Sequence, residues 1–85
     1  MQYYRLEDLY EELEEYKKEA EKLRTGIAVY SEILEENLDY KEKAKSLRRF
    51  INRFEKELSV TLFKCAIIEG IIKRDECLRG IQPKD

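Results

Sequence analysis

Two stripes of apolar residues, each with alternating steps of three and four residues, constrain the fold of this chain more than any other feature. The first comprises Leu6, Leu9, Leu13, Tyr16, Ala20, Leu23, Ile27, Tyr30 and Leu34. The second comprises Ala44, Leu47, Ile51, Phe54, Leu58, Thr61, Cys65, Ile68 and Ile72. Such spacing keeps one face of an α-helix against a partner helix, whereas a strand would alternate at every second residue. The sequence therefore predicts an all-α fold of two long helices.

The segment between the stripes predicts a turn at residues 37–39. Asn37 is suited to end a helix in a left-handed conformation, and Asp39 with Glu42 matches the capping-box pattern that begins one. A turn there folds the stripes together as an antiparallel helical hairpin. Leu23 is then expected opposite Phe54, and Leu6 is expected opposite Ile72.

The 85 residues are expected to form a single helical domain, 1–85. Its predicted parts are a helix over about 3–36, a turn at 37–39, a helix over about 40–73, and a short helical turn and tail over 74–85. Thr25-Gly26 is the weak point of the first helix, because glycine costs about 1 kcal/mol relative to alanine in a helix interior. The stripe keeps its phase through Gly26, so we expect a continuous or mildly kinked helix, with a break there as the alternative.

Composition favours long helices over disorder, because charged and apolar residues each make up 42% of the chain. We see no signal-peptide pattern near Met1. The longest apolar-rich window, 58–72, contains Lys64 and Glu69 and falls short of the roughly 20 residues that span a bilayer. We therefore expect a cytoplasmic protein with no membrane partner.

The chain has two cysteines and no histidine. The spacing of Cys65 and Cys77 matches no common zinc pattern. Cys65 lies in the second stripe, where a free thiol packs as a small apolar residue, and we expect buried or inert thiols, with a redox or intermolecular role for Cys77 as the alternative. Histidine is the usual carrier of general acid–base chemistry near pH 7. We therefore predict a protein that is not an enzyme and uses no cofactor or metal.

The second half of the second predicted helix is apolar on almost every side. On the face opposite the seam, the sequence places Val60, Phe63, Ile67 and Gly70, with Ile71 on the flank. A lone hairpin cannot bury such a helix, and a domain this small is marginal by itself. We predict self-association through 58–72, first as a dimer that forms a four-helix bundle, with a larger homo-oligomer or a groove for a partner helix as alternatives. Tyr3, Tyr4 and Tyr10 are expected to cover its edge, with their hydroxyls in water.

Charges of opposite sign are segregated along the chain. Acidic residues dominate 7–21, and basic residues dominate 41–56. The predicted basic ridge comprises Lys45, Arg48, Arg49, Arg53 and Lys56. It suits an acidic protein surface or a phosphate backbone. The alternative is a solvated coiled-coil face whose charges pair with Glu32, Glu35 and Glu36 and hold two chains in register. A pI near 5.3 and the lack of interleaved aromatic residues rank nucleic acid below an unknown protein partner.

One set of carboxylates suggests an enzymatic alternative. The E-E-x-x-E then E-x-x-D arrangement comprises Glu11, Glu12, Glu15, Glu36 and Asp39. It resembles the all-α, MazG-like nucleoside triphosphate pyrophosphatases, and the resemblance implies carboxylates converging on magnesium. A straight helix would separate Glu15 and Glu36 by about 30 Å, so that site requires a chain reversal at Thr25-Gly26. We rank first a non-enzymatic helical interaction protein, a small regulator, adaptor or inhibitor, that binds a macromolecule through its charged ends.

Overall fold

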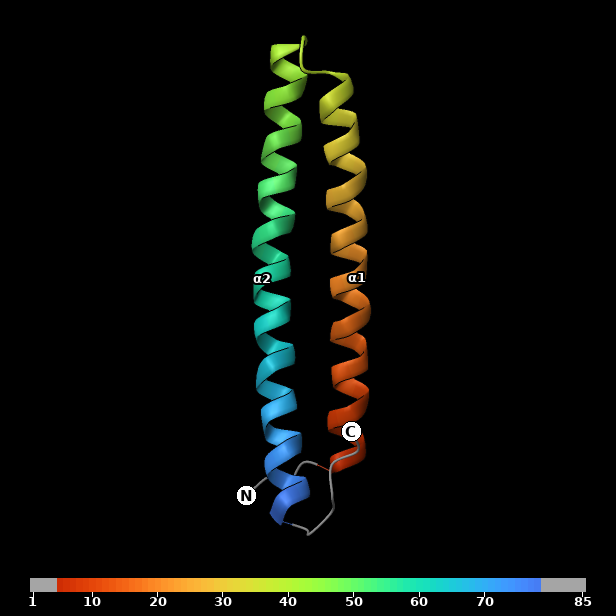
Figure 1. Ribbon diagram of the computed structural model, residues 1–85, viewed down its shortest axis with the longest axis vertical. Helices are drawn as coiled ribbons and strands as arrows, with labels where there is room; N and C mark the ends of the chain where they lie inside the picture. Colours follow the sequence, from red (N-terminus) through yellow and green to blue (C-terminus); the bar gives the residue numbers. More distant parts are fainter. Residues whose placement is uncertain (1–4, 79–85) are drawn as a thin grey trace.

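The computed structural model describes residues 5–78 and shows an antiparallel hairpin of two long helices (Figure 1). Helix α1 spans Leu6–Glu36 and helix α2 spans Lys41–Leu78. The all-α hairpin predicted from the apolar stripes is therefore confirmed. Helix α2 continues to Leu78, so the short helical turn expected after residue 73 is a direct continuation of α2. Residues 3–4 of the first predicted helix and residues 79–85 of the predicted tail lie outside the described residues.

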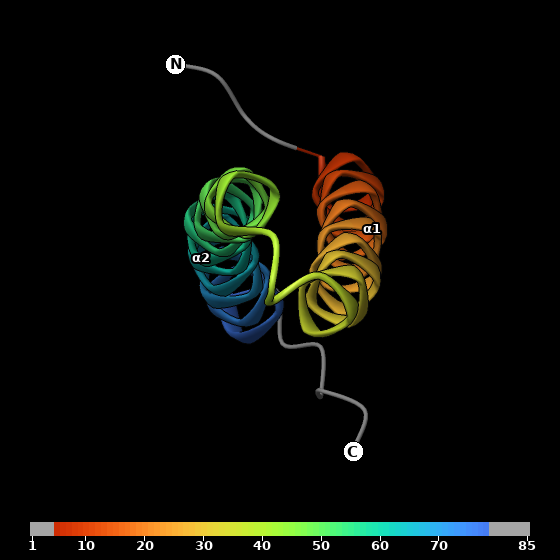
Figure 2. The same ribbon diagram turned by 90° about the horizontal axis from the view of Figure 1, so that it is seen from above.

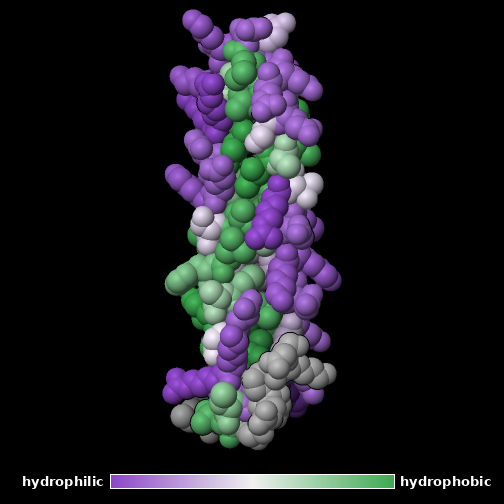
Figure 3. Space-filling view, viewed as in Figure 1, coloured by the Kyte–Doolittle hydropathy of each residue, from purple (hydrophilic) through white to green (hydrophobic). Residues whose placement is uncertain are grey.

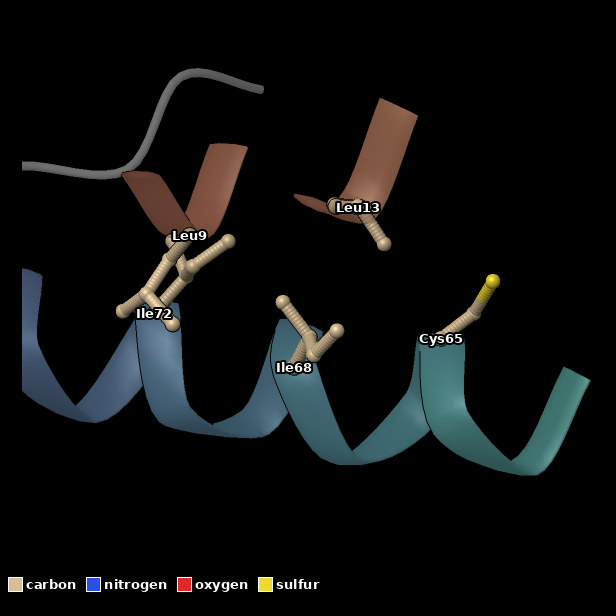
Figure 4. Close-up of a cluster of buried hydrophobic side chains, with 5 residues drawn as sticks. All are labelled: Leu9, Leu13, Cys65, Ile68 and Ile72. Atoms are coloured by element: carbon tan, nitrogen blue, oxygen red, sulfur yellow. The ribbon is translucent and has the colours of Figure 1, made fainter. Parts of the chain in front are cut away.

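The two stripes form the seam between the helices, because every residue in them is buried or half-buried. Leu9 and Leu13 of α1 pack with residues of α2 near the open end, namely Cys65, Ile68 and Ile72 (Figure 4). Leu6 and Tyr16 extend this cluster. In Figure 3 an apolar band follows the line where the helices meet, with hydrophilic side chains on both sides. Burial of this band is the main source of stability in the hairpin.

The helices cross at a shallow angle: in the view along the axis, α2 lies higher than α1 at the near end, which carries the turn, and lower than α1 at the far end (Figure 2). A line drawn from the axis of α2 to the axis of α1 rotates counterclockwise as it moves away from the viewer in Figure 2. The two helices therefore wind around each other with a left-handed twist. A strict seven-residue repeat produces this hand, because the seam must follow a period of 3.5 residues on helices whose natural period is 3.6. The spacing of the stripes thus explains the twist as well as the pairing.

Helix α1 runs through Gly26 without a break, as the phase of the stripe predicts. The ring of Phe54 lies over this glycine, and a Cβ atom built there would be 3.7 and 3.8 Å from its two nearest ring carbons. Phe54 also stacks on Tyr30, with ring centroids 5.5 Å apart, and Tyr30 stacks on Phe50 at 5.8 Å. An aromatic cluster therefore holds the helices together at the position where the glycine weakens α1.

Phe54 packs against Gly26 and Tyr30, which lie nearer the turn than Leu23, the partner expected from the sequence. Leu9 lies beside Ile72 in Figure 4, and Leu6, the partner expected for Ile72, packs against the same cluster. In both contacts the partner on α1 lies nearer the turn than the residue expected from the sequence. Side chains lean toward the N-terminus of their own helix, and in an antiparallel pair this lean displaces contacts in that direction.

Asn37 ends α1, but not in the predicted left-handed conformation. Its φ is −123° and its ψ is 24°. The Asn37 amide Nδ2 donates a hydrogen bond to the carbonyl oxygen of Ile33 at 2.6 Å, and its backbone N–H donates to the carbonyl oxygen of Leu34 at 3.0 Å. These bonds satisfy carbonyl groups that the end of a helix leaves without partners, so no positive φ is required.

Helix α2 begins one residue later than the predicted capping box implies. Its first helical residue is Lys41, and the carbonyl oxygen of Tyr40 accepts the first helical hydrogen bond, from the N–H of Ala44 at 2.8 Å. Tyr40 therefore holds the N-cap position that the pattern assigned to Asp39. The N–H of Tyr40 in turn donates to the carbonyl oxygen of Asn37 at 3.0 Å, which closes the turn.

Candidate interaction surfaces

The half of α2 farther from the turn carries a set of apolar residues that the hairpin leaves exposed to solvent. All five residues of the predicted interface are exposed, and we call them the apolar flank: Val60, Phe63, Ile67, Gly70 and Ile71. Phe63 is the most exposed, at 66% of its full area, followed by Val60 at 53%. Figure 3 shows apolar side chains reaching the outer edge of α2 in this half. Contiguous apolar residues on a surface are typical of sites that contact another molecule.

Part of the apolar flank borders the seam instead of lying opposite it, which corrects the sequence interpretation. Two adjacent hollows of about 410 and 250 Å³ lie between the helices, and both are lined by Tyr16 and Lys64. Val60 lines the first hollow, while Ile67 and Ile71 line the second. We call the side of the hairpin that carries these hollows the groove face. Three apolar residues of α2 thus extend the seam outward on this face.

Charged residues border the same hollows. The ammonium nitrogen of Lys64 lies 5.5 Å from the centre of the Tyr16 ring, a cation–π contact that contributes about 0.5–1 kcal/mol at an exposed site. On α1, Glu12 lines one hollow and Glu19 lines the other. The groove face therefore combines an apolar floor with charges of both signs, which favours a partner of matching charge pattern over a purely apolar ligand.

The five residues of the predicted basic ridge are all exposed along the half of α2 near the turn. Arg53 pairs with Glu57 on the next turn, with 4.0 Å between the guanidinium Nε and the carboxylate oxygen. Within residues 5–78 the ridge makes no ion pair with the glutamates expected as partners, Glu32, Glu35 and Glu36. In this hairpin the ridge is thus a solvated cationic surface.

Tyr10 and Glu76 form a contact that sequence analysis missed. The Tyr10 hydroxyl donates a hydrogen bond to Oε1 of Glu76, a side chain that is only 8% exposed. This bond raises the pKa of Tyr10, and burial and the nearby carboxylate charge act in the same direction. The hydroxyl was expected to remain in water; Tyr3 and Tyr4, grouped with it, lie outside the described residues. The next step of the alternating stripe after Ile72 falls on Asp75, so the pattern did not place Glu76 in the seam.

The carboxylates of the MazG-like resemblance are not brought together. Because α1 is continuous, Glu15 and Glu36 lie on one helix, about 30 Å apart at its rise per residue. Over residues 5–78, no group of three or more acidic or cysteine side chains is arranged to hold a metal ion. Cys65 is buried in the seam and Cys77 is exposed, both as free thiols.

Comparison with known protein families, with curated proteins and with solved structures finds no match to this chain. Between residues 5 and 78, neither helix has a stretch that is both apolar and long enough to cross a bilayer. The function of the protein must therefore be inferred from the surfaces of the hairpin.

Proposed function

We propose that this protein is a non-enzymatic helical interaction module that associates with itself through residues 58–72 and binds a macromolecular partner through its charged ends. The observation that carries the proposal is the apolar flank, because a hairpin with an exposed Phe63 beside exposed Val60 and Ile67 has surface to bury. Closed homo-oligomers are the commonest result of such a surface, and twofold dimers lead among them. Two hairpins paired in this way form a four-helix bundle.

The size of the apolar flank is consistent with a dimer that also uses polar contacts. From their exposed fractions, Val60, Phe63, Ile67 and Ile71 together present roughly 400 Å² of surface, within the range of the largest apolar patch on a monomer. A stable interface buries about 800 Å² per partner. The remainder would come from the charged residues beside the hollows, which resemble the polar rim of ordinary interfaces.

Self-association is tested by measuring molar mass by light scattering after size exclusion, over a range of protein concentrations. We expect a dimer or larger assembly for the natural protein and a folded monomer for Phe63→Glu, because a charge at that site cannot be buried against a second copy. Ser59→Glu places the same charge one turn away, outside the apolar flank, and is the matched control. A natural protein that stays monomeric, or a Phe63→Glu variant that stays associated, would contradict the proposal.

The charged ends supply the second half of the proposal, contact with an acidic protein surface. The exposed ridge residues Lys45, Arg48 and Arg49 support it, because they have no ion-pair partner among residues 5–78. This arrangement fits a small regulator, adaptor or inhibitor that works in the cytoplasm. The same exposed cations make nucleic acid the second candidate.

Salt dependence separates these two candidates. Each phosphate that a bound protein neutralises adds about one unit to the slope of log affinity against log salt concentration. Binding of duplex DNA or of RNA that weakens steeply with salt and disappears in Arg49→Glu with Arg53→Glu would establish the nucleic-acid function. Binding that is absent, or unaffected by the substitutions, would leave the ridge to a protein partner.

A further inference from the structure

Four residues of α2 form a row on the groove face. Phe50, Glu57, Lys64 and Ile71 follow one another at intervals of seven residues, which is two helical turns. Glu57, Lys64 and Ile71 line the hollows beside the seam. Phe50, nearer the turn, stacks on Tyr30. Phe50 and Ile71 are both partly exposed, at 46% and 42%. The row is therefore apolar, acidic, basic and apolar along one exposed edge.

The row on one copy of α2 is complementary to the same row on a second copy that runs in the opposite direction. When two copies of α2 lie antiparallel, Phe50 of one falls opposite Ile71 of the other, and Glu57 falls opposite Lys64. A twofold axis repeats both contacts, so the dimer gains two apolar pairs and two ion pairs. In a parallel arrangement in register, Glu57 would face Glu57 and Lys64 would face Lys64, which is unfavourable. A closed dimer needs a surface that is self-complementary in this sense.

We propose that a second copy of this chain docks on the groove face with its α2 antiparallel to α2, so that the turn of each hairpin lies over the open end of the other. This inference rests on the proposed self-association and specifies its geometry. It assigns Val60, Ile67 and Ile71 to the interface and places Phe63 at its edge.

The segregation of charge along the rod favours the same orientation. Residues 7–21 contain eight acidic and two basic side chains, so this stretch near the open end carries a charge of −6. Residues 41–56 contain seven basic and two acidic side chains, a charge of +5 near the turn. Stacking turn over open end brings these stretches of opposite sign toward each other. Stacking turn over turn would instead place like-charged ends together.

Each member of the proposed ion pair makes one weak contact elsewhere among residues 5–78. Glu57 contacts Arg53 at 4.0 Å, the limit of an ion pair, between side chains that are more than half exposed. Such a pair contributes little and leaves a carboxylate oxygen for a second cation. Lys64 lies over the face of Tyr16, at 5.5 Å from the ring centre. Both side chains are thus available to a second copy.

Charge reversal tests the pairing directly. Glu57→Lys and Lys64→Glu alone are each expected to weaken dimer affinity by about tenfold, because each replaces two attractive contacts with two repulsive ones. The double variant restores opposite charges between the copies and should return the affinity to within about threefold of the natural value. Glu57 and Lys64 of one chain lie about 10 Å apart along the helix, so restoration cannot come from a contact within the chain.

Sedimentation equilibrium gives these affinities, and circular dichroism checks that each variant stays helical. If the natural protein dimerises and the double variant binds no better than the single ones, the antiparallel pairing is wrong while self-association stands. If the natural protein is monomeric at every concentration, both proposals fall.

Disulfide formation between copies reports the orientation independently. In a Cys77→Ser background, Phe50→Cys and Ile71→Cys are made as separate proteins. Mild oxidation should join the two when mixed and should leave each one uncrosslinked by itself. Phe50→Cys chains that crosslink with one another would show a parallel arrangement and overturn the inference.

Discussion

Replacing Gly26 with alanine tests whether the aromatic cluster leaves room in the middle of α1. The new Cβ would lie 3.7 Å from the nearest carbon of Phe54, which is ordinary van der Waals contact. Alanine gains about 1 kcal/mol over glycine in a helix interior. The contact with Phe54 adds about a few tenths of a kcal/mol, because the methyl group is only partly removed from water. We therefore expect a stabilisation of about 1 to 1.5 kcal/mol from these two contributions.

The assay is thermal unfolding followed by far-ultraviolet circular dichroism, with all variants at the same protein concentration because association shifts the midpoint. A gain of this size raises the Tm of a small domain by roughly 4–8 °C for each kcal/mol. Gly70→Ala is the matched control, since no atom of residues 5–78 beyond its chain neighbours and the adjacent backbone of α2 lies within 4 Å of its Cβ position, so that within the hairpin only the helix-propensity gain applies. If Gly70→Ala stabilises the protein while Gly26→Ala destabilises it, Phe54 needs the space that glycine leaves, and the reasoning is refuted.

Three further predictions concern the seam, the turn and the open end. Ile68→Ala should destabilise the hairpin by about 2–5 kcal/mol in urea unfolding, because this side chain is buried in the seam cluster. Asn37→Gly should lower stability by about 1 kcal/mol in the same assay, since it removes the amide bond to the Ile33 carbonyl and the φ of −123° gives glycine no advantage. Tyr10→Phe should be less stable than the natural protein at neutral pH. Because Glu76 raises the pKa of folded Tyr10 above its unfolded value of 10.0, this difference should persist below pH 10 and shrink as the folded group ionises at higher pH, as midpoints measured across that range will show.

The fold was predictable because its information lies in spacing, which is local to each helix. Every stripe residue between Leu6 and Ile72 is at least half-buried, and Gly26 does not interrupt α1 because the apolar phase continues through it. The exposure of Phe63 was predictable for the same reason, since a residue that the seam does not use must face outward. The details of the turn were less predictable from the sequence. Asn37 has two ways to satisfy the end of a helix, and only the structure shows that its side-chain amide does this.

The contact between Tyr10 and Glu76 was beyond the reach of the apolar pattern. A buried carboxylate is costly unless a donor meets it, so a glutamate in the seam is not expected without knowledge of its partner. That partner lies on the other helix, and identifying it requires the register between helices to better than one turn. The row on the groove face has the same character. Its residues are spaced for one edge of α2, but only the hollows beside the seam show which edge that is.

The spacing of apolar residues determines the register between the two helices less well than it determines the helices themselves, for a geometric reason. Each side chain leans toward the N-terminus of its own helix, and in an antiparallel pair these two directions are opposite. Contacts therefore join residues that lie farther along both helices than the facing backbone positions. Ile72 lies beside Leu9, one turn beyond Leu6, and Phe54 lies over Gly26, also about one turn beyond Leu23. The same lean must operate between two antiparallel copies of α2, so the proposed pairing of Phe50 with Ile71 specifies side-chain contacts, and its backbone centre lies about one residue nearer the turn.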